Sequence, residues 1–292
     1  MFTDMKRGVS GDDIDNEENS MRSLAHLLLI MLAVSIQPAL AQGWDLVVCA
    51  EASNLPFSHK TEQGFENRVA EVIANELGAN LVFTWVEPPF ASVRDHLIDT
   101  GQCDVIMGIN DGHPHYLTTV VYYRTIYHFL YLDNSGLDIE SFDDEELQSA
   151  SIGILVPGRG GISPIAQSLS RRGLANNQKS FTVSAAQPNP LLQLPEAVLE
   201  GIVDVAVVPG PIAGYFQKVL NQPVLIKPVQ PQIDLPFVPM YYSVSMGVRP
   251  GDESLRDDLN LAITNRWEEI QTILDEFGVE RLPLPTPAVS GR

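Results

Sequence analysis

The feature that most constrains the fold is a regular alternation of short apolar runs with amphipathic segments. Leu46 to Ala50 is apolar, and after a turn-rich loop an amphipathic pattern covers Phe65 to Leu77 and stops at Gly78. Further apolar runs follow at 81–86 and 104–108, with a helical pattern over 91–100 between them. Strands that alternate with helices through short connections form parallel-rich sheets covered by helices. The sequence therefore predicts an α/β protein.

The alternation occurs in two cycles, which predicts two lobes. Strands are expected at 151–156, 180–184 and 203–208 in the second cycle, with helices ending near Gly173 and Gly201. The apolar run Thr125 to Leu132 is long enough to pass from one lobe to the other, and Tyr241 to Val248 returns the chain. We expect lobe 1 over 44–131 and 240–285, lobe 2 over 132–239, two hinge crossings and a flexible tail over 286–292.

The N-terminal region has the pattern of a secretory signal. Arg22 and His26 precede the apolar run Leu27 to Ile36, and small residues predict cleavage after Ala41. The alternative is a membrane anchor, but the apolar run is shorter than the roughly 20 residues that span a bilayer. Residues 1–20 are acidic and polar, which is unlike a signal peptide, so we expect translation to start at Met21. The mature chain is predicted to have no membrane span.

The chain is strongly acidic, with a net charge of −19 that becomes −16 when residues 1–41, with their six acidic and three basic side chains, are removed. Such a charge repels nucleic acids and anionic lipids and favours basic partners. Solubility alone explains it equally well. Two cysteines, Cys49 and Cys103, remain in the mature chain. An exported protein can form this disulfide, but parallel neighbouring strands would hold the two residues about 13 Å apart, which argues against the bond. No metal-binding spacing is present.

Several blocks of sequence resemble a known family in their joint order and spacing. They are VVCAEASNLPFSHKTEQGFENRVAEVIANELG at 47–78, GQCDVIMG at 101–108, YYRT at 122–125, SRRGL at 170–174, PNP at 188–190, VDVAVVPGPIAGYF at 203–216 and MGVRPGDESLRDDLN at 246–260. Together they resemble type II periplasmic solute-binding proteins and, more narrowly, the MoxJ/XoxJ family of proteins associated with quinoprotein methanol dehydrogenases.

The resemblance implies a periplasmic, non-catalytic accessory protein that assists the maturation or activation of a pyrroloquinoline-quinone (PQQ) dependent alcohol dehydrogenase. The chain would carry no cofactor of its own, whereas the partner would carry PQQ and a calcium or lanthanide ion. The acidic surface would suit basic faces of that dehydrogenase or of its c-type cytochrome.

Two departures from amino-acid-binding relatives bear on the alternatives. The loop after the third predicted strand, residues 110–116, lacks the arginine that grips a ligand carboxylate, and Pro209 stands where an aspartate would meet the ligand ammonium. An ordinary amino-acid receptor is therefore disfavoured, while a transport receptor for another, unidentified small ligand remains an alternative. A dehydratase on the same fold would also need the missing arginine, and no hydrolase, zinc-protease or dinucleotide motif is present.

Loops that follow the carboxyl ends of parallel strands commonly bind ligands, which nominates the loops after Ala50, Gly108, Val156 and Val208. The candidate cleft or partner-binding residues are Glu51, Asn54, Phe57, Asn110, Asp111, Arg159, Gly160, Pro209, Gly210 and Tyr215, with Tyr122, Tyr123 and Arg124 at the hinge. Arg159 and Gly160 precede a helix and could attract an anion, whereas Tyr and Arg are frequent interface anchors. Each has a plainer reading, as a solvated loop residue, a flexible turn, or core and hinge packing. A metal site at His113 and His115 would need a third ligand.

Overall fold

The computed structural model describes residues 43–86, 96–97, 100–156, 163–183 and 188–288. The predicted signal segment, most of the helix predicted over 91–100, the loop 157–162 and residues 289–292 of the predicted tail lie outside these ranges. The described residues from Gly43 onward belong to one compact unit. The residue boundaries of the two lobes therefore stay a prediction, and the lobes are defined below by their hydrophobic cores.

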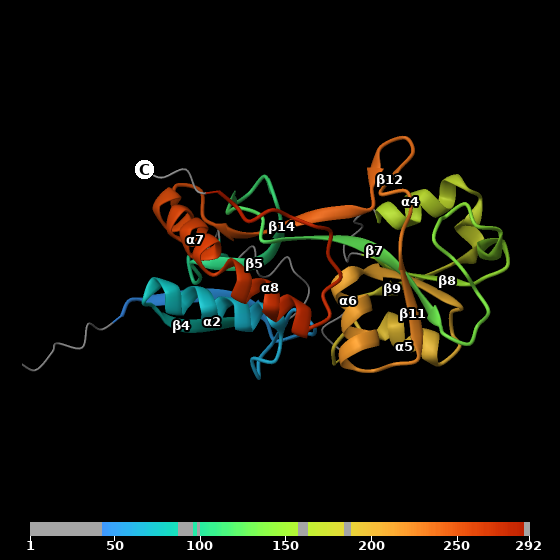
Figure 1. The fold of residues 1–292 in the computed structure, drawn as a ribbon, viewed down its shortest axis with the longest axis horizontal. Helices are drawn as coiled ribbons and strands as arrows, with labels where there is room; N and C mark the ends of the chain where they lie inside the picture. Colours follow the sequence, from blue (N-terminus) through green and yellow to red (C-terminus); the bar gives the residue numbers. More distant parts are fainter. Residues whose placement is uncertain (1–42, 87–95, 98–99, 157–162, 184–187, 289–292) are drawn as a thin grey trace, which may run out of the picture. The chain divides into compact units, whose positions relative to one another are not determined.

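Lobe 1 contains the N-terminal and C-terminal elements. They are β1 (Asp45–Glu51), β2 (Ser53–Asn54), β3 (Ser58–His59), α2 (Phe65–Leu77), β4 (Asn80–Val86), β5 (Val105–Asn110), β6 (Leu117–Thr118), β14 (Tyr241–Val248), α7 (Glu253–Asn265) and α8 (Trp267–Glu276). Strands β4 and β5 flank β1 and run parallel to it, whereas β14 is antiparallel to β5. Helix α2 packs against α7 and α8 (Figure 1).

Helix α2 forms where the 3.6-residue pattern predicts it. Its buried face includes Phe65, Val69 and Ile73, which pack into the main core of lobe 1. It ends at Gly78, whose left-handed backbone (φ 64°) lets its N–H bond to the carbonyls of Ala74 and Asn75. A second, smaller core of this lobe contains Cys49, Cys103 and Ile106. Because Val48 and Cys49 are neighbours on β1, they point to opposite faces of the sheet.

Lobe 2 contains the remaining elements. They are η2 (Glu145–Gln148), β8 (Ile152–Val156), α4 (Pro164–Arg171), η3 (Leu174–Asn177), β9 (Gln178–Thr182), α5 (Gln193–Leu199), β10 (Val205–Pro209), α6 (Gly210–Gly214), η4 (Tyr215–Val219), β11 (Val224–Pro228), β12 (Ile233–Asp234) and β13 (Val238–Pro239). Strands β10, β8 and β9 are parallel neighbours. Two cores cover the two faces of this part of the sheet, as Val207 belongs to one and Ala206 to the other.

Two long strands link the lobes. The start of β7 (Tyr123–Leu132) pairs with β14, and the rest of β7 pairs antiparallel with β10 and β11. The two linking strands lie side by side in Figure 1. The two-lobed α/β class predicted from the sequence is confirmed, with antiparallel strands at the centre of one continuous sheet. Residues 109–124, between the apolar runs predicted at 104–108 and 125–132, contain the end of β5, all of β6 and the start of β7, none of which was predicted.

The C-terminal segment Val279–Leu284 forms a third link that the sequence did not predict. The carbonyl of Glu280 accepts a hydrogen bond from Thr125 Oγ1 at 2.7 Å, and the Leu282 amide donates to the Arg124 carbonyl at 2.8 Å. On the lobe 2 side Gly278, which immediately precedes this segment, approaches α6 so closely that a Cβ on Gly214 would lie 1.7 Å from the Gly278 carbonyl oxygen. Glycine is therefore required at position 214.

The expectation that Cys49 and Cys103 are too far apart is wrong. Their Cα atoms are 5.5 Å apart and the two residues form a disulfide. The strand-spacing argument failed because the chain bends before β5, so Cys103 does not extend that strand backwards. Val47 fixes the bend, because its carbonyl accepts from the Asp104 amide at 2.8 Å and its amide donates to the Asp104 carboxylate at 2.9 Å.

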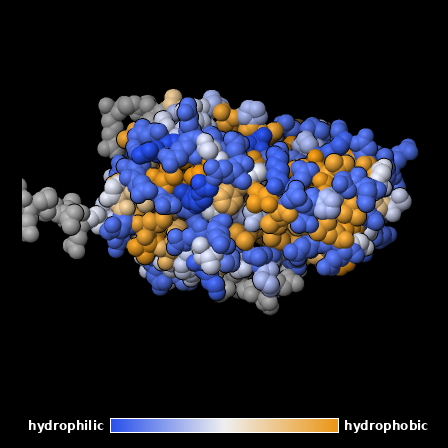
Figure 2. Space-filling view, turned by 60° about the horizontal axis from the view of Figure 1, so that its bottom comes forward, coloured by the Kyte–Doolittle hydropathy of each residue, from blue (hydrophilic) through white to orange (hydrophobic). Residues whose placement is uncertain are grey.

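The surface mixes polar and apolar residues. The face in Figure 2 carries hydrophobic patches between hydrophilic ones. Exposed large apolar residues of the described chain are Trp44, Val82, Ile202, Val219, Leu225, Ile233, Leu235, Phe237 and Leu261. None of the described helices has the length and apolar character needed to cross a membrane.

Candidate functional site

Two buried carboxylates flank the loop after β1, the first of the loops that are predicted to line the cleft. Glu51 is the last residue of β1 and is 3% exposed, while Glu66 lies in the first turn of α2 and is 8% exposed. The loop between them turns back so that the amides of Phe65 and Glu66 donate to the carbonyls of Pro56 and Phe57, each at 2.9 Å. The carboxyl end of β1 and the N-terminus of α2 are thereby held together, which agrees with the strand-end rule.

The carboxyl end of β5 meets the same site. Gly108 has a left-handed backbone (φ 67°), and a Cβ at this position would lie 2.0 Å from Oε1 of Glu66. Any side chain here would displace the carboxylate. Glycine at position 108 therefore allows both the left-handed backbone near the end of β5 and the close approach of α2. The carboxylate of Glu66 packs directly against the backbone of Gly108.

Both glutamates are held in an environment that favours their neutral form. Burial raises the pKa of Glu51 to about 8, and burial together with the charge of Glu51 raises the pKa of Glu66 to about 8. Within the described residues, neither carboxyl oxygen of Glu51 has a hydrogen-bond partner, and the same holds for Oδ1 of Asn54. Such a site can retain protons at neutral pH or accept hydrogen bonds from a cationic or donor-rich group.

The hinge tyrosines are core residues. Tyr122 and Tyr123 are both buried in the core of lobe 1, so the suggestion that they are exposed interface anchors is wrong. The physical reason is the pairing of β7 with β14, which places Tyr123 opposite Val244 inside the sheet. Burial, with a contribution from the charge of Glu66, raises the pKa of both hydroxyls well above the ordinary tyrosine value.

Arg124 joins three segments at the hinge. Its Nε donates to Ser243 Oγ at 3.0 Å, and its guanidinium lies 5.6 Å from the ring centre of Tyr241, both on β14. Its backbone carbonyl accepts from Leu282 of the C-terminal segment. These contacts support the packing interpretation of this residue.

The loop after β5 is mostly exposed. Asn110 and Asp111 are both exposed, and the Asp111 carboxylate accepts from Thr118 Oγ1 at 3.2 Å and Ser245 Oγ at 3.3 Å. The rings of His113 and His115 are 5.7 Å apart. Across the described ranges there is no cluster of three or more histidine, cysteine, aspartate or glutamate residues arranged to hold a metal ion.

A series of aromatic contacts connects the two lobes. Phe57, which is half-buried, lies 5.3 Å from Phe65, and Phe65 lies 6.1 Å from Phe277 at the end of α8. Phe277 stacks on Tyr215 of lobe 2, with ring centres 6.3 Å apart. Tyr215 is buried, which favours the core-packing reading of this candidate, because the stacking covers its ring.

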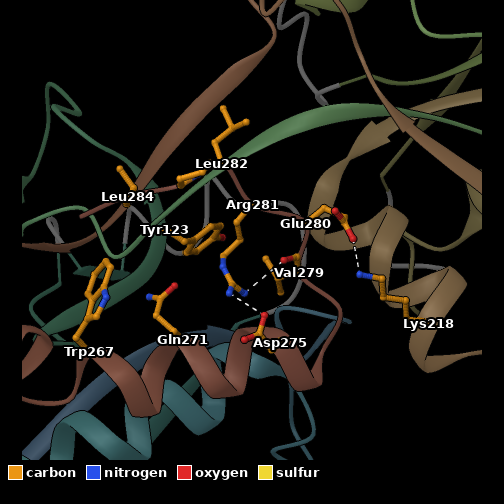
Figure 3. Close-up of a pocket in the computed structure, with 11 residues that line it drawn as sticks. Tyr123, Lys218, Trp267, Gln271, Asp275, Val279, Glu280, Arg281, Leu282 and Leu284 are labelled. Carbon is orange, nitrogen blue, oxygen red and sulfur yellow. Dashed lines mark hydrogen bonds and ion pairs between the residues drawn. The ribbon is translucent and has the colours of Figure 1, made fainter. Parts of the chain in front are cut away.

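Pro209 and Gly210 support the C-terminal segment. Pro209 ends β10, and a Cβ on Gly210 would lie 2.8 Å from the Glu280 carbonyl oxygen. Beside this contact is a cavity of about 430 Å³, drawn in Figure 3. Its lining residues come from both lobes and from the C-terminal segment: Tyr123, Lys218, Trp267, Gln271, Asp275, Val279, Glu280, Arg281, Leu282, Pro283 and Leu284. Its cations are paired, since Lys218 contacts Glu280 at 2.6 Å and Arg281 contacts Asp275 at 2.7 Å.

The structure thus brings Glu51, Asn54 and Phe57 together at one end of lobe 1, while Pro209, Gly210 and Tyr215 contact the C-terminal elements. Arg159 and Gly160 lie outside the described residues. Sequence reasoning missed Glu66, although an acidic residue on the apolar side of an amphipathic helix is a usable signal. It also missed the ion pair between Arg172 and Asp234 in lobe 2, because these two residues are 62 positions apart in the chain.

The fold and the strand-end site define a type II periplasmic binding protein. No family model matches the chain. Its sequence is 30% identical to protein MoxJ of Paracoccus denitrificans over 260 residues, which cover 84% of this chain and 92% of MoxJ. On this similarity the chain belongs to the MoxJ family.

Solved structures agree with this assignment. MxaJ from Methlophaga aminisulfidivorans MPT is similar with a TM-score of 0.71 and 26% identity, covering 81% of this chain and all of MxaJ. The periplasmic binding protein XoxJ from Methylobacterium extorquens AM1 is similar with a TM-score of 0.66 and 27% identity, covering 82% of this chain and all of XoxJ.

Proposed function

We propose that this protein is a non-catalytic periplasmic accessory protein that binds a PQQ-dependent methanol or alcohol dehydrogenase and assists its maturation or activation. The observation that carries the proposal is the similarity to MoxJ over most of the chain. In this proposal PQQ and its metal ion belong to the dehydrogenase, and the acidic chain faces basic surfaces of that enzyme or of its cytochrome c.

The site geometry supports this proposal over amino-acid transport. The loop 110–116 contains no arginine, and Pro209 replaces the aspartate of the zwitterion clamp. In place of a clamp, lobe 1 has Glu51 and Glu66, whose raised pKa values favour the uncharged carboxyl groups. A free amino acid, which carries a carboxylate, would meet two acids, while the side chain of Arg124, a cation among the described candidate residues, is engaged by Ser243 and Tyr241.

The proposal can be tested in the host by deleting the gene and restoring residues 1–292 from a plasmid. We expect the deletion to lower dye-linked alcohol dehydrogenase activity in periplasmic extracts without lowering the amount of dehydrogenase polypeptide, and the restored chain to recover it. Unchanged activity per dehydrogenase molecule in the deletion strain would contradict the proposal. Restoration with a chain that lacks residues 21–41 would test the predicted export signal, and we expect it to fail.

A transport receptor for a small molecule is the second candidate, and the unpartnered carboxylate of Glu51 favours it. A buried acceptor without a partner costs free energy, which a ligand with a cationic or donor-rich group would recover. Mass spectrometry of the denatured protein purified from its host tests this candidate. A stoichiometric small molecule that is lost in Glu51→Gln would support it, and a protein without any such molecule would not.

A further inference from the structure

An exposed hairpin of lobe 2 carries large apolar side chains at its tip. Strands β12 and β13 pair through Ile233–Pro239 and Asp234–Val238, and Leu235 and Phe237 lie between them. Leu235 is 77% exposed and Phe237 is 87% exposed. The hairpin projects from the body of the molecule in Figure 1. Single exposed apolar residues are ordinary, but a leucine and a phenylalanine together at a projecting tip are typical of an interaction site.

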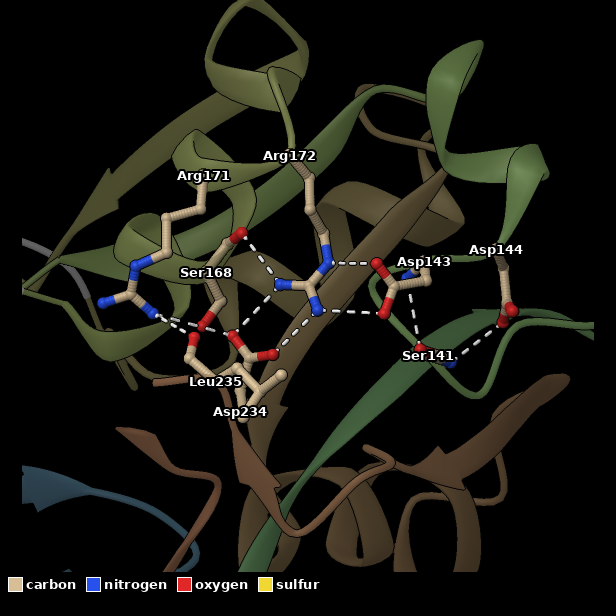
Figure 4. A network of polar contacts seen from close by, with 8 residues as sticks. All are labelled: Ser141, Asp143, Asp144, Ser168, Arg171, Arg172, Asp234 and Leu235. Carbon is tan, nitrogen blue, oxygen red and sulfur yellow. Dashed lines mark hydrogen bonds and ion pairs between the residues drawn. The ribbon is translucent and has the colours of Figure 1, made fainter. Parts of the chain in front are cut away.

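The base of this hairpin is firmly attached to lobe 2 (Figure 4). Asp234, which is 1% exposed, accepts hydrogen bonds from both terminal nitrogens of Arg172, at 3.0 and 2.7 Å. The same guanidinium donates to the two carboxylate oxygens of Asp143, at 2.6 and 3.0 Å. Arg171 donates to the Leu235 carbonyl at 2.8 Å. A bidentate arginine between two carboxylates fixes the hairpin in place, so its apolar tip is presented without a large loss of entropy on binding.

The surroundings of the hairpin are acidic. The segment before η2 contacts the base of the hairpin, since the Gln230 amide donates to the Glu140 carbonyl at 2.7 Å and Ser141 bridges to Gln230. This segment carries the exposed acids Asp138, Glu140 and Asp143, and Lys227 pairs with the first two. With Glu145 and Glu146 also exposed in η2, the segment keeps a net negative charge.

We propose that the tip Leu235–Phe237 is the docking anchor of this protein for its dehydrogenase partner. It would insert into an apolar pocket of the partner that is bordered by lysine or arginine residues, because the tip is apolar and its surroundings are acidic. This inference rests on the proposed function for the identity of the partner. The geometry of the tip and its surroundings assigns the chemistry of the partner's binding site, which is one apolar pocket with a basic rim.

The test uses the mature chain, residues 42–292, and the purified dehydrogenase from the same host in biolayer interferometry. We expect Phe237→Ser and Leu235→Ser each to raise the dissociation constant about tenfold or more, as for central aromatic and aliphatic anchors. Leu261→Ser is the matched control, because Leu261 is 50% exposed on α7 of lobe 1, and it should leave binding unchanged. Binding of the unchanged chain should also weaken as ionic strength rises.

The outcomes separate the two proposals. If the unchanged chain binds and both hairpin variants bind equally well, the docking anchor is wrong while the proposed function stands. If the unchanged chain does not bind, the proposed function fails. If light scattering shows that the unchanged chain is a dimer and Phe237→Ser is a monomer, the tip contacts a second copy and the inference is overturned. Because both side chains are exposed, the variants should melt at the temperature of the unchanged protein.

Discussion

The two lobes bury carboxylates in opposite ways. In lobe 1 burial raises the pKa of both Glu51 and Glu66 to about 8, with no cation among the described residues to offset it. In lobe 2 the hydrogen bonds from Arg172 hold the pKa values of Asp234 and Asp143 below the ordinary aspartate value. A paired buried acid can fix a structure, whereas an unpaired one costs free energy and is commonly retained at a functional site. The contrast supports a structural role for the buried Asp234 of lobe 2, and it leaves Glu51 and Glu66 as the candidate ligand-binding acids of lobe 1.

Removing the disulfide is the largest expected perturbation, and it is confined to lobe 1. The bond closes a loop between residues separated by 54 positions, so the double variant Cys49→Ala, Cys103→Ala should lower the free energy of unfolding by about 4 kcal/mol. Urea denaturation measures the loss, and hydrogen exchange should place it in β1 and β5. An equal loss of protection in β8 and β10 would show that the lobes do not respond separately.

Removing the cation of lobe 2 should make its buried acid resemble those of lobe 1. Arg172→Met leaves Asp234 buried without its main partner, and we expect a loss of about 3 kcal/mol at neutral pH. In the unchanged protein the pKa of Asp234 is lower in the folded state than in the unfolded state. Asp234 therefore stabilises the fold at pH values above its unfolded-state pKa, and this stability is lost as the pH falls through the folded-state pKa. The variant should therefore lose little further stability in acid. Arg171→Met, which removes the 3.9 Å contact with Asp234 and an exposed hydrogen bond to the Leu235 carbonyl, is the control and should cost about 1 kcal/mol.

A substitution at Gly214 perturbs the link between the lobes without changing any of the acidic residues compared above. Gly214→Ala forces the backbone at Gly278 to move, and we expect a loss of about 2 kcal/mol. Gly136→Ala is the control, because its Cβ meets nothing within 4 Å and only the left-handed backbone costs about 1 kcal/mol. Thermal melting of both variants measures the difference. Equal melting temperatures would mean that the backbone at Gly278 does not pack closely against α6.

The smallest expected effect tests the acids of lobe 1. Because the folded pKa of Glu66 lies above its unfolded value, its stabilising contribution is complete below about pH 4.5 and is lost as the pH rises to about 8. Glu66→Gln should therefore be more stable than the unchanged protein at pH 8, by on the order of 1 kcal/mol, since the buried amide still costs desolvation. The gain should vanish at pH 5. Glu71→Gln, which changes an exposed glutamate on the same helix, is the control.

Much of the fold could be predicted from periodicity alone. Helix α2 and strands β4 and β14 agree with the sequence pattern to within a residue. Helix α2 buries an apolar face and the C-terminal half of β14 is buried, whereas β4 is matched by its apolar residues although only Val86 of it is buried. The disulfide, β11 and the C-terminal link could not be predicted. The disulfide depends on a bend before β5, β11 carries the polar residue Lys227, and the C-terminal link depends on close backbone contacts at Gly210 and Gly214. None of these features has a periodic signal in the sequence.

The candidate site was predicted in part. The strand-end rule led to Glu51 and Asn54, which the structure buries at the end of β1, near the start of α2. The rule could not show that Tyr122 and Tyr215 are covered, because that depends on tertiary partners, β14 and Phe277.

Direct binding of the mature chain to the purified quinoprotein dehydrogenase tests the central claim most directly. The account predicts a saturable one-to-one complex in isothermal titration calorimetry, which weakens with added salt and persists in Glu51→Gln. No heat of binding at any salt concentration, together with a small molecule retained only while Glu51 is present, would contradict the accessory role and establish the solute receptor instead.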